Sequence, residues 1–169
     1  MRKILLVCSF MFTLYSYGQH NLEISLQQDI RLFLVGDQKG NDPLTINFLS
    51  KVEIPVYNLK KNHLSTYFSV EYADLVGKNY QRYALGAGYV VKSIYRRIGA
   101  GAYLDFGKIY RKKQGYFSYS LSGELNYKIN NRLKFIVTQQ LTHRKDLKVL
   151  YNVKNEYIIS GFAGLKYSM

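Results

Sequence analysis

Charged side chains are the residues of this chain best placed to do chemistry, because cysteine and histidine are scarce. The chain has one Cys and three His, which excludes a disulfide framework and a cysteine-based zinc site. Both signs occur in similar numbers among the charges that fall well inside predicted strands and share one face: Glu23, Asp29, Arg31, Lys51, Glu53, Glu71, Arg82, Asp105, Glu124 and Lys166. Because an unpaired buried charge is costly, we expect a mutually paired interior network. The alternative is a path for protons or ions. The small barrel predicted below from the strand pattern leaves little room for such a path.

A second set of candidate residues is basic and lies in two predicted loops. These residues are Lys108, Arg111, Lys112, Lys113, Arg144 and Lys145. In a functional interpretation they hold lipopolysaccharide phosphates or an acidic partner through charge-assisted hydrogen bonds. The alternative is a solvated basic loop, since surface charges are common and individually weak.

A catalytic site would need a nucleophile, a base and an orienting group. Only His143 lies near the predicted outer edge, where Ser118 and Asp105 could approach it. Its position in the strand pattern points its side chain away from Ser118. We therefore expect no enzymatic activity, no metal and no cofactor, with a membrane-embedded lipid hydrolase as the alternative.

The N-terminus has the layout of a secretory signal peptide. Arg2 and Lys3 form a basic start, and residues 4–14 are mostly apolar. Ser16 and Gly18 are small residues three positions and one position before the predicted cleavage site of the signal peptide. We predict a signal peptide over residues 1–18 and a mature domain over 19–169. The formal charge of +13 would otherwise suggest nucleic acid, but export makes that partner unexpected.

Alternation of apolar and polar residues organises the rest of the chain. It predicts strands over residues 22–34, 44–56, 64–72, 82–91, 98–106, 117–127, 133–142 and 157–167. Ile136, Ile158 and Phe162 do not fit the alternation. Longer loops at 35–42, 74–79, 107–115 and 143–154 alternate with tight turns at 58–62, 92–96 and 130–131. This order predicts an all-β fold, an eight-stranded antiparallel up-and-down barrel.

The sizes of the side chains on the two faces favour a transmembrane barrel. The polar face is rich in Gly, Ser and Ala, whereas the apolar face carries many of the 17 Tyr and 9 Phe residues. So many rings would overfill a small interior but suit a lipid-facing surface with aromatic girdles. The remaining alternative is a soluble periplasmic lipid-binding barrel. Gly86, Gly88, Gly99 and Gly101 leave room on one inner wall, which Arg31 is predicted to help fill.

With these features, the chain resembles the small eight-stranded bacterial outer-membrane barrels of the outer membrane protein X type, and the exported barrels of Bacteroidetes-type bacteria. The resemblance rests on the signal peptide, the Gly- and aromatic-rich strand at 83–91 and the C-terminal segment 164–169. It implies that the termini face the periplasm and the longer loops face outward. It also implies that Leu165, Tyr167 and Met169 form the signal read by the barrel assembly machinery, with Met169 in place of the usual Phe.

These observations predict a small integral outer-membrane barrel with a closed polar interior, exported through the secretory pathway. Its partners would be outer-membrane lipid, including lipopolysaccharide phosphates, and the assembly machinery. It would act in the envelope as a structural or surface-interaction protein through its extracellular loops.

Overall fold

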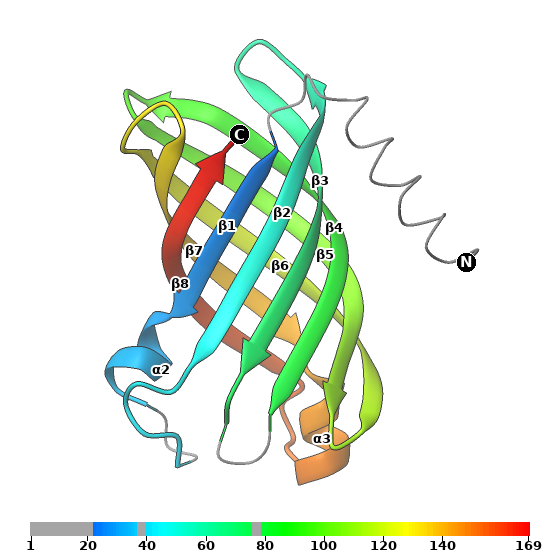
Figure 1. The fold of residues 1–169 in the computed structure, drawn as a ribbon. Coiled ribbons are helices and arrows are strands. Elements are labelled where there is room, and N and C mark those ends of the chain that lie inside the picture. Colours follow the sequence, from blue (N-terminus) through cyan, green and yellow to red (C-terminus); the bar gives the residue numbers. More distant parts are fainter. Residues whose placement is uncertain (1–21, 37–39, 76–78) are drawn as a thin grey trace, which may run out of the picture.

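The computed structural model describes residues 22–36, 40–75 and 79–169. The predicted signal peptide, residues 1–18, lies outside the described residues. Eight antiparallel strands follow one another around a closed barrel (Figure 1). The strands are β1 (Glu23–Asp29), β2 (Asn47–Asn58), β3 (Asn62–Ala73), β4 (Tyr80–Tyr95), β5 (Ile98–Arg111), β6 (Gln114–Lys128), β7 (Leu133–His143) and β8 (Tyr157–Ser168). The predicted eight-stranded up-and-down barrel is confirmed.

Two short helices lie at one end of the barrel, α2 (Ile30–Leu34) and α3 (Lys145–Tyr151). Figure 1 shows both at the end with the longer connections, whereas the start of β1 and the C-terminus lie at the opposite end. In the described part of the chain, neither helix is long and apolar enough to cross a membrane. Both helices lie at the mouth of the barrel (Figure 1).

The first strand is shorter than its alternation predicts. Residues 22–34 were expected to form one strand, but β1 ends at Asp29, whose carboxylate accepts a hydrogen bond from the backbone N–H of Leu32 at 3.0 Å. This contact satisfies one of the free N–H groups that begin a helix. The chain turns into α2 there, and the period-2 pattern of the next five residues is coincidental.

The predicted long loop at 107–115 is also mostly strand. Residues of β5 and β6 pair as far as Arg111 and Gln114, so only Lys112 and Lys113 form the turn. Both have positive φ, 50° and 64°, which is the conformation of a two-residue hairpin turn that normally favours Asn and Gly. The sequence signal for such a turn is missing, which explains why the pattern indicated a loop.

The two faces of the barrel are inverted relative to a soluble protein. Large apolar side chains such as Leu85, Phe106 and Leu125 are 66%, 54% and 59% exposed on the outer surface. The inward face buries charged and hydroxyl groups. An exposed apolar surface of this extent suits a lipid environment, and the predicted assignment of the faces is confirmed.

Aromatic rings occupy the interior space beside the small residues. Tyr67 and Tyr103 are 2% and 1% exposed, and their rings meet edge to face at 5.5 Å. A Cβ added to Gly88 would lie 2.3 Å from Cδ1 of Tyr103, and one added to Gly86 would lie 2.6 Å from Cζ of Tyr67. The glycines therefore make room for these two rings, and not for Arg31 as the sequence suggested.

Candidate functional site

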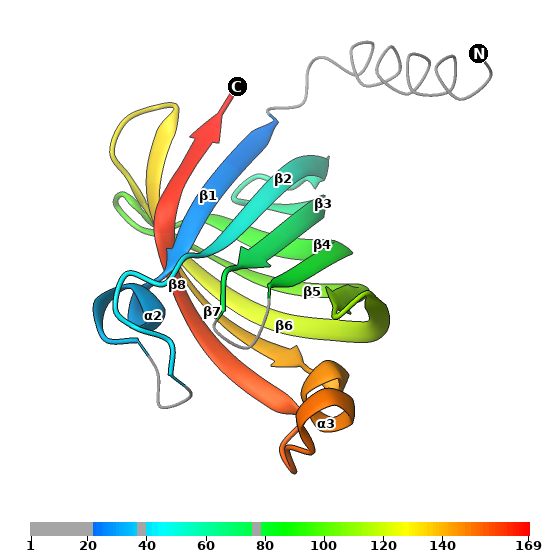
Figure 2. The same ribbon diagram turned by 60° about the horizontal axis from the view of Figure 1, so that its bottom comes forward.

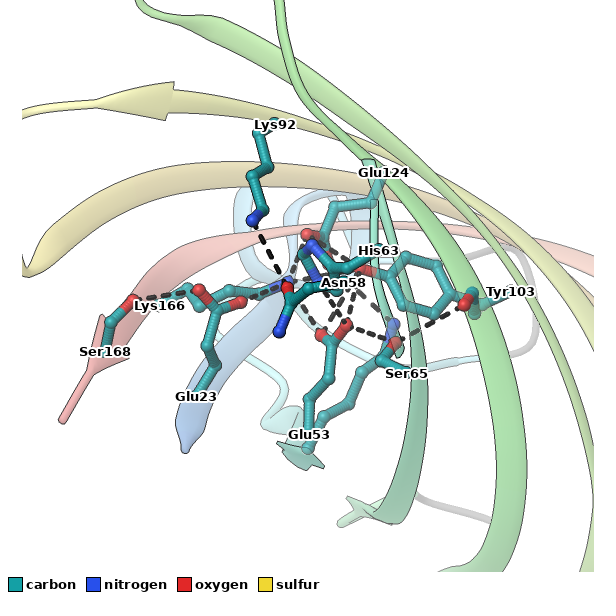
Figure 3. Close-up of polar contacts among 12 residues, drawn as sticks. Glu23, Glu53, Asn58, His63, Ser65, Lys92, Tyr103, Glu124, Lys166 and Ser168 are labelled. Atoms are coloured by element: carbon teal, nitrogen blue, oxygen red, sulfur yellow. Dashed lines mark hydrogen bonds and ion pairs between the residues drawn. The ribbon is translucent and has the colours of Figure 1, made fainter. Parts of the chain in front are cut away.

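The densest polar cluster fills the barrel near the end with the short turns, around Lys166 of β8 (Figure 3). Its ammonium contacts Glu53 Oε2 at 3.1 Å, Glu23 Oε2 at 3.9 Å and the carboxylate of Glu124. Tyr103 OH lies 3.3 Å from the same nitrogen. These groups come from β1, β2, β5, β6 and β8, so the cluster joins strands that are far apart in the sequence.

Lys51 of β2 is the second cation of this cluster. Its Nζ lies 3.9 Å from Glu124 Oε2 and 4.5 Å from the ring centroid of Tyr103. The side chain is 3% exposed, and its Nζ has no hydrogen-bond partner among the described residues. The ring of Tyr103 thus supplies part of the environment of a buried ammonium group through a cation–π contact.

A second polar layer lies further along the barrel and is centred on Arg82 of β4. The Arg82 guanidinium forms an ion pair with Asp105, and its Nε donates to Ser118 Oγ at 3.1 Å. Asp105 also accepts hydrogen bonds from Ser120 at 2.8 Å and from Tyr67 OH at 2.8 Å. Each charge in this layer therefore has an opposite charge and further hydrogen bonds.

Apolar side chains complete the interior. Leu49, Ile136 and Phe162 are each 1% exposed or less. Ile136 and Phe162 are two of the residues that break the alternation. Their apolar side chains at inward positions were the sequence feature that could have indicated an apolar layer inside the barrel. Together with Tyr67 and Tyr103, they fill the middle of the barrel with bulky groups.

The remaining predicted interior charges lie nearer the end with the helices. Glu71 is buried and accepts a hydrogen bond from Tyr80 OH at 3.1 Å, and Asp29 accepts one from Asn47 Nδ2 at 3.4 Å. Arg31 was predicted to belong to the interior network, but it lies on α2 and is exposed. The reason is that α2 replaces the outer part of the predicted first strand.

The six basic loop residues fall into two groups. Lys108, Lys112, Lys113 and Lys145 are exposed. Arg111 and Arg144 are 6% and 8% exposed and share the carboxylate of Asp146, which is itself 0% exposed. Arg144 makes two hydrogen bonds to it at 2.8 and 2.9 Å, and Arg111 Nη1 lies 3.5 Å away. These two arginines hold α3 against the barrel and are not solvated loop cations. Sequence reasoning missed Asp146 as their partner.

The possible catalytic group of Ser118 and His143 does not assemble. Ser118 faces the interior, and its Oγ donates to the backbone carbonyl of His143 at 2.9 Å. The His143 ring stacks on Tyr119 at 4.8 Å, and its Nε2 lies 2.9 Å from Glu156 Oε2. The imidazole of His143 therefore lies on the outer side of the barrel wall, whereas the hydroxyl of Ser118 lies on the inner side. Among the described residues, no group of three or more His, Cys, Asp or Glu side chains could hold a metal ion.

Two ionisable groups outside the strands have shifted pKa values. The pKa of the Glu156 carboxyl lies below its ordinary value of 4.5, because the carboxylate is hydrogen-bonded to Lys148 and His143. Burial opposes the charged form of Arg144, but Tyr80 and the hydrogen bonds to Asp146 outweigh it and raise the pKa of the guanidinium. Both side chains are charged at neutral pH, which favours the ion pairs of Glu156 with Lys148 and of Arg144 with Asp146.

The predicted assembly signal lies on the last strand. Leu165 and Tyr167 are 48% and 41% exposed on the outer face of β8, and Met169 follows the strand and is 63% exposed. All three side chains are accessible from outside the barrel. Their recognition by assembly machinery stays a prediction.

No protein-family model and no curated protein matches this chain. Among solved structures, the Yersinia pestis outer membrane protein Ail in a phospholipid bilayer nanodisc gives a TM-score of 0.54 at 13% identity, over 89% of this chain and 99% of that chain. Two crystal structures of Ail, one in complex with the heparin analogue sucrose octasulfate, give TM-scores of 0.47 and 0.46 at 12% and 11% identity, over 89% of this chain and 97% of theirs. The chain has the fold of an outer-membrane β-barrel.

Proposed function

We propose that this protein is a small, non-enzymatic integral outer-membrane barrel with a closed interior, which acts at the cell surface through the end that carries α2 and α3. The observation that carries the proposal is the inversion of the two faces. Leu85, Phe106 and Leu125 point outward, while the ion pairs of Lys166 and Arg82 fill the inside. A bilayer stabilises this arrangement and water does not. As part of the same proposal, we place the protein among the barrels of the outer membrane protein X type.

Fractionation of the host envelope tests the location. The protein is expected in the outer-membrane fraction, and unheated samples in detergent are expected to migrate differently from boiled ones on a gel. Recovery from the soluble periplasm would instead support a soluble lipid-binding barrel.

The closed interior rests on bulky buried side chains across the middle of the barrel. Tyr67, Tyr103, Ile136 and Phe162 are each 2% exposed or less, and eight strands enclose only enough space for side chains. We expect no stable single-channel conductance in a planar bilayer. Steady conductance of the purified barrel would contradict a closed interior.

The absence of enzymatic activity is inferred from the separation of Ser118 from the His143 ring. A lipid hydrolase would need both groups on the same side of β6 and β7. Purified barrel is expected to release no fatty acid from phospholipid or lipopolysaccharide. An activity that is lost in His143→Ala would support the hydrolase instead.

Lipopolysaccharide phosphates are the partner that the exposed lysines favour. Lys108, Lys112 and Lys113 lie close together in one hairpin with no acidic neighbour in the turn. Their simultaneous change to Gln is expected to weaken lipopolysaccharide binding by the barrel and to flatten its dependence on salt. The same charge change at the opposite end, in Lys60, Lys61 and Lys128, is the matched control. Equal losses in the two triple variants would exclude a specific contact at the hairpin.

The barrel assembly machinery is the second proposed partner. Tyr167 is an outward aromatic residue near the end of β8, two positions before Met169. Tyr167→Ala is expected to lower the amount of heat-modifiable protein in the outer membrane, whereas Tyr127→Ala, at an outward position of β6, leaves it nearly unchanged. Equal amounts in wild type and Tyr167→Ala would argue against this signal.

A further inference from the structure

A cavity of about 1100 Å³ lies at the mouth of the barrel between α2 and α3. It is bordered by the ends of several strands and by both helices, which Figure 2 shows apart from each other at this end. The volume is slightly larger than that of most small-molecule sites, which measure about 300–1,000 Å³. The interior ion-pair cluster around Lys166 does not line it, so the cavity is a separate feature.

Apolar side chains from three elements line this cavity. Leu32 comes from α2, Leu147 from α3 and Ile158 from β8. Leu32 and Leu147 are 5% and 6% exposed. These side chains suit the hydrocarbon part of a ligand.

One cation in the lining keeps a hydrogen-bond donor unused. Arg111 is 6% exposed, and its Nε has no hydrogen-bond partner among the described residues. The guanidinium lies 4.8 Å from the ring centroid of Tyr151 at the end of α3. A buried donor without a partner is costly, and an anionic acceptor would satisfy it.

Around Arg111, two guanidinium groups meet a single carboxylate. Arg111 and Arg144 both line the cavity and share the single carboxylate of Asp146, which lies behind them. The rest of the lining carries one further cation, Arg31 of α2, and two acids. Asp29 caps α2 and accepts a hydrogen bond from Asn47, and Glu71 accepts one from Tyr80. Arg144 makes both hydrogen bonds to Asp146, while Arg111 has only the 3.5 Å contact. A headgroup with a single negative charge therefore suits Arg111.

From these contacts we infer that the mouth of the barrel binds a single-chain amphiphile with a monoanionic headgroup. The headgroup accepts a hydrogen bond from Arg111 Nε, and the hydrocarbon chain packs between Leu32 and Leu147. This ligand is distinct from the lipopolysaccharide proposed for the exposed lysines, and the site does not depend on that proposal.

Dodecanoate carrying ¹³C at its carboxyl carbon is the probe, with the purified barrel in phosphatidylcholine nanodiscs and empty nanodiscs as the background. Saturable binding with a shifted carboxyl resonance is expected for the wild type. Dodecanol, which has the same chain and no charge, is expected to bind at least roughly tenfold more weakly, as a lost charge-assisted hydrogen bond implies.

Two variants separate the parts of the site, and a third is the control. Arg111→Gln removes the donor and the charge, and Leu32→Trp fills the cavity from α2 while leaving Arg111 in place. Each is expected to weaken dodecanoate binding by roughly tenfold or more. Lys128→Gln removes the same charge from an exposed position at the opposite end of the barrel and is expected to bind dodecanoate like wild type. Heat-modifiable migration checks that each variant is folded.

Three outcomes would overturn the inference. The first is wild-type affinity in Leu32→Trp, and the second is an equal loss in Lys128→Gln and Arg111→Gln. The third is equal affinity of the wild type for dodecanoate and dodecanol. Any of these outcomes leaves the outer-membrane barrel proposal intact, because that proposal is tested by fractionation and gel migration.

Discussion

Replacing Lys166 with Met removes the central cation of the interior cluster while keeping a side chain of similar length. Lys166 Nζ lies 3.1 Å from Glu53 Oε2, 3.9 Å from Glu23 Oε2 and in contact with Glu124. At an effective dielectric constant of about 20, the contacts with Glu53 and Glu23 correspond to roughly 5 and 4 kcal/mol of attraction before desolvation is subtracted. Removing one partner of a buried ion pair leaves an uncompensated charge, for which the net cost is about 3–5 kcal/mol.

The assay is urea unfolding in detergent micelles, followed by circular dichroism because the chain contains no Trp. Lys166→Met is expected to lower the free energy of unfolding by roughly 3–5 kcal/mol. Lys128→Met, at an exposed position near the turn between β6 and β7, is the control and should change it by less than about 0.5 kcal/mol.

A double variant tests whether the loss comes from the carboxylate left without its cation. Adding Glu124→Gln to Lys166→Met is expected to recover at least about 1 kcal/mol, because the two residues are directly coupled. If the free energy of unfolding of Lys166→Met is within about 1 kcal/mol of the wild-type value, the cluster does not stabilise the barrel and the reasoning is refuted.

The other predictions concern interior packing and the outer loop. Gly88→Ala places a Cβ 2.3 Å from the Tyr103 ring and should lower the free energy of unfolding by about 1–3 kcal/mol. The control is Gly123→Ala, whose added Cβ has no heavy atom within 4 Å and should leave the free energy of unfolding unchanged. Equal effects of the two variants in the same urea titration would contradict the proposed packing against Tyr103. Glu156→Gln should speed amide exchange in residues 144–156 at pH 7. Because the pKa of Glu156 is lowered in the folded protein, its stabilising effect is present above the ordinary pKa and is lost as the pH falls through the lowered value. The exchange rates of variant and wild type should therefore converge in acid, and a difference that persists there would count against the ion pair with Lys148.

The barrel itself could be predicted from the sequence because its signal is repeated along the whole chain. Alternation places polar residues such as Glu53 and Glu124 on one face and residues such as Phe106 on the other in strand after strand. The same alternation predicted the inward face of the charged residues correctly except for Arg31, which lies on α2 and is exposed. Their individual partners could not be predicted, because a contact such as Lys166 with Glu53 depends on the strand stagger across the barrel.

The mouth of the barrel was harder to predict because local contacts override the periodic pattern there. Asp29 ends β1 by capping α2, although residues 30–34 continue the alternation. Lys112 and Lys113 form a tight turn without the residues that usually signal one. Arg111 and Arg144 carry charges typical of solvated loops, yet Asp146 holds both in buried positions, and no local sequence feature indicates that pairing.

We propose that the chain crosses the outer membrane as a barrel, with the helices outside and the short turns in the periplasm. Its one Cys, Cys8, lies in the predicted signal peptide, so single cysteines can be placed at Lys113, Leu121 and Arg132 and treated with a membrane-impermeant maleimide. The account predicts that Lys113→Cys reacts in intact cells, that Arg132→Cys reacts only after the outer membrane is permeabilised, and that Leu121→Cys, on the lipid-facing side of β6, reacts only after denaturation. Reaction of Leu121→Cys in the native protein, or of Arg132→Cys in intact cells, would contradict it.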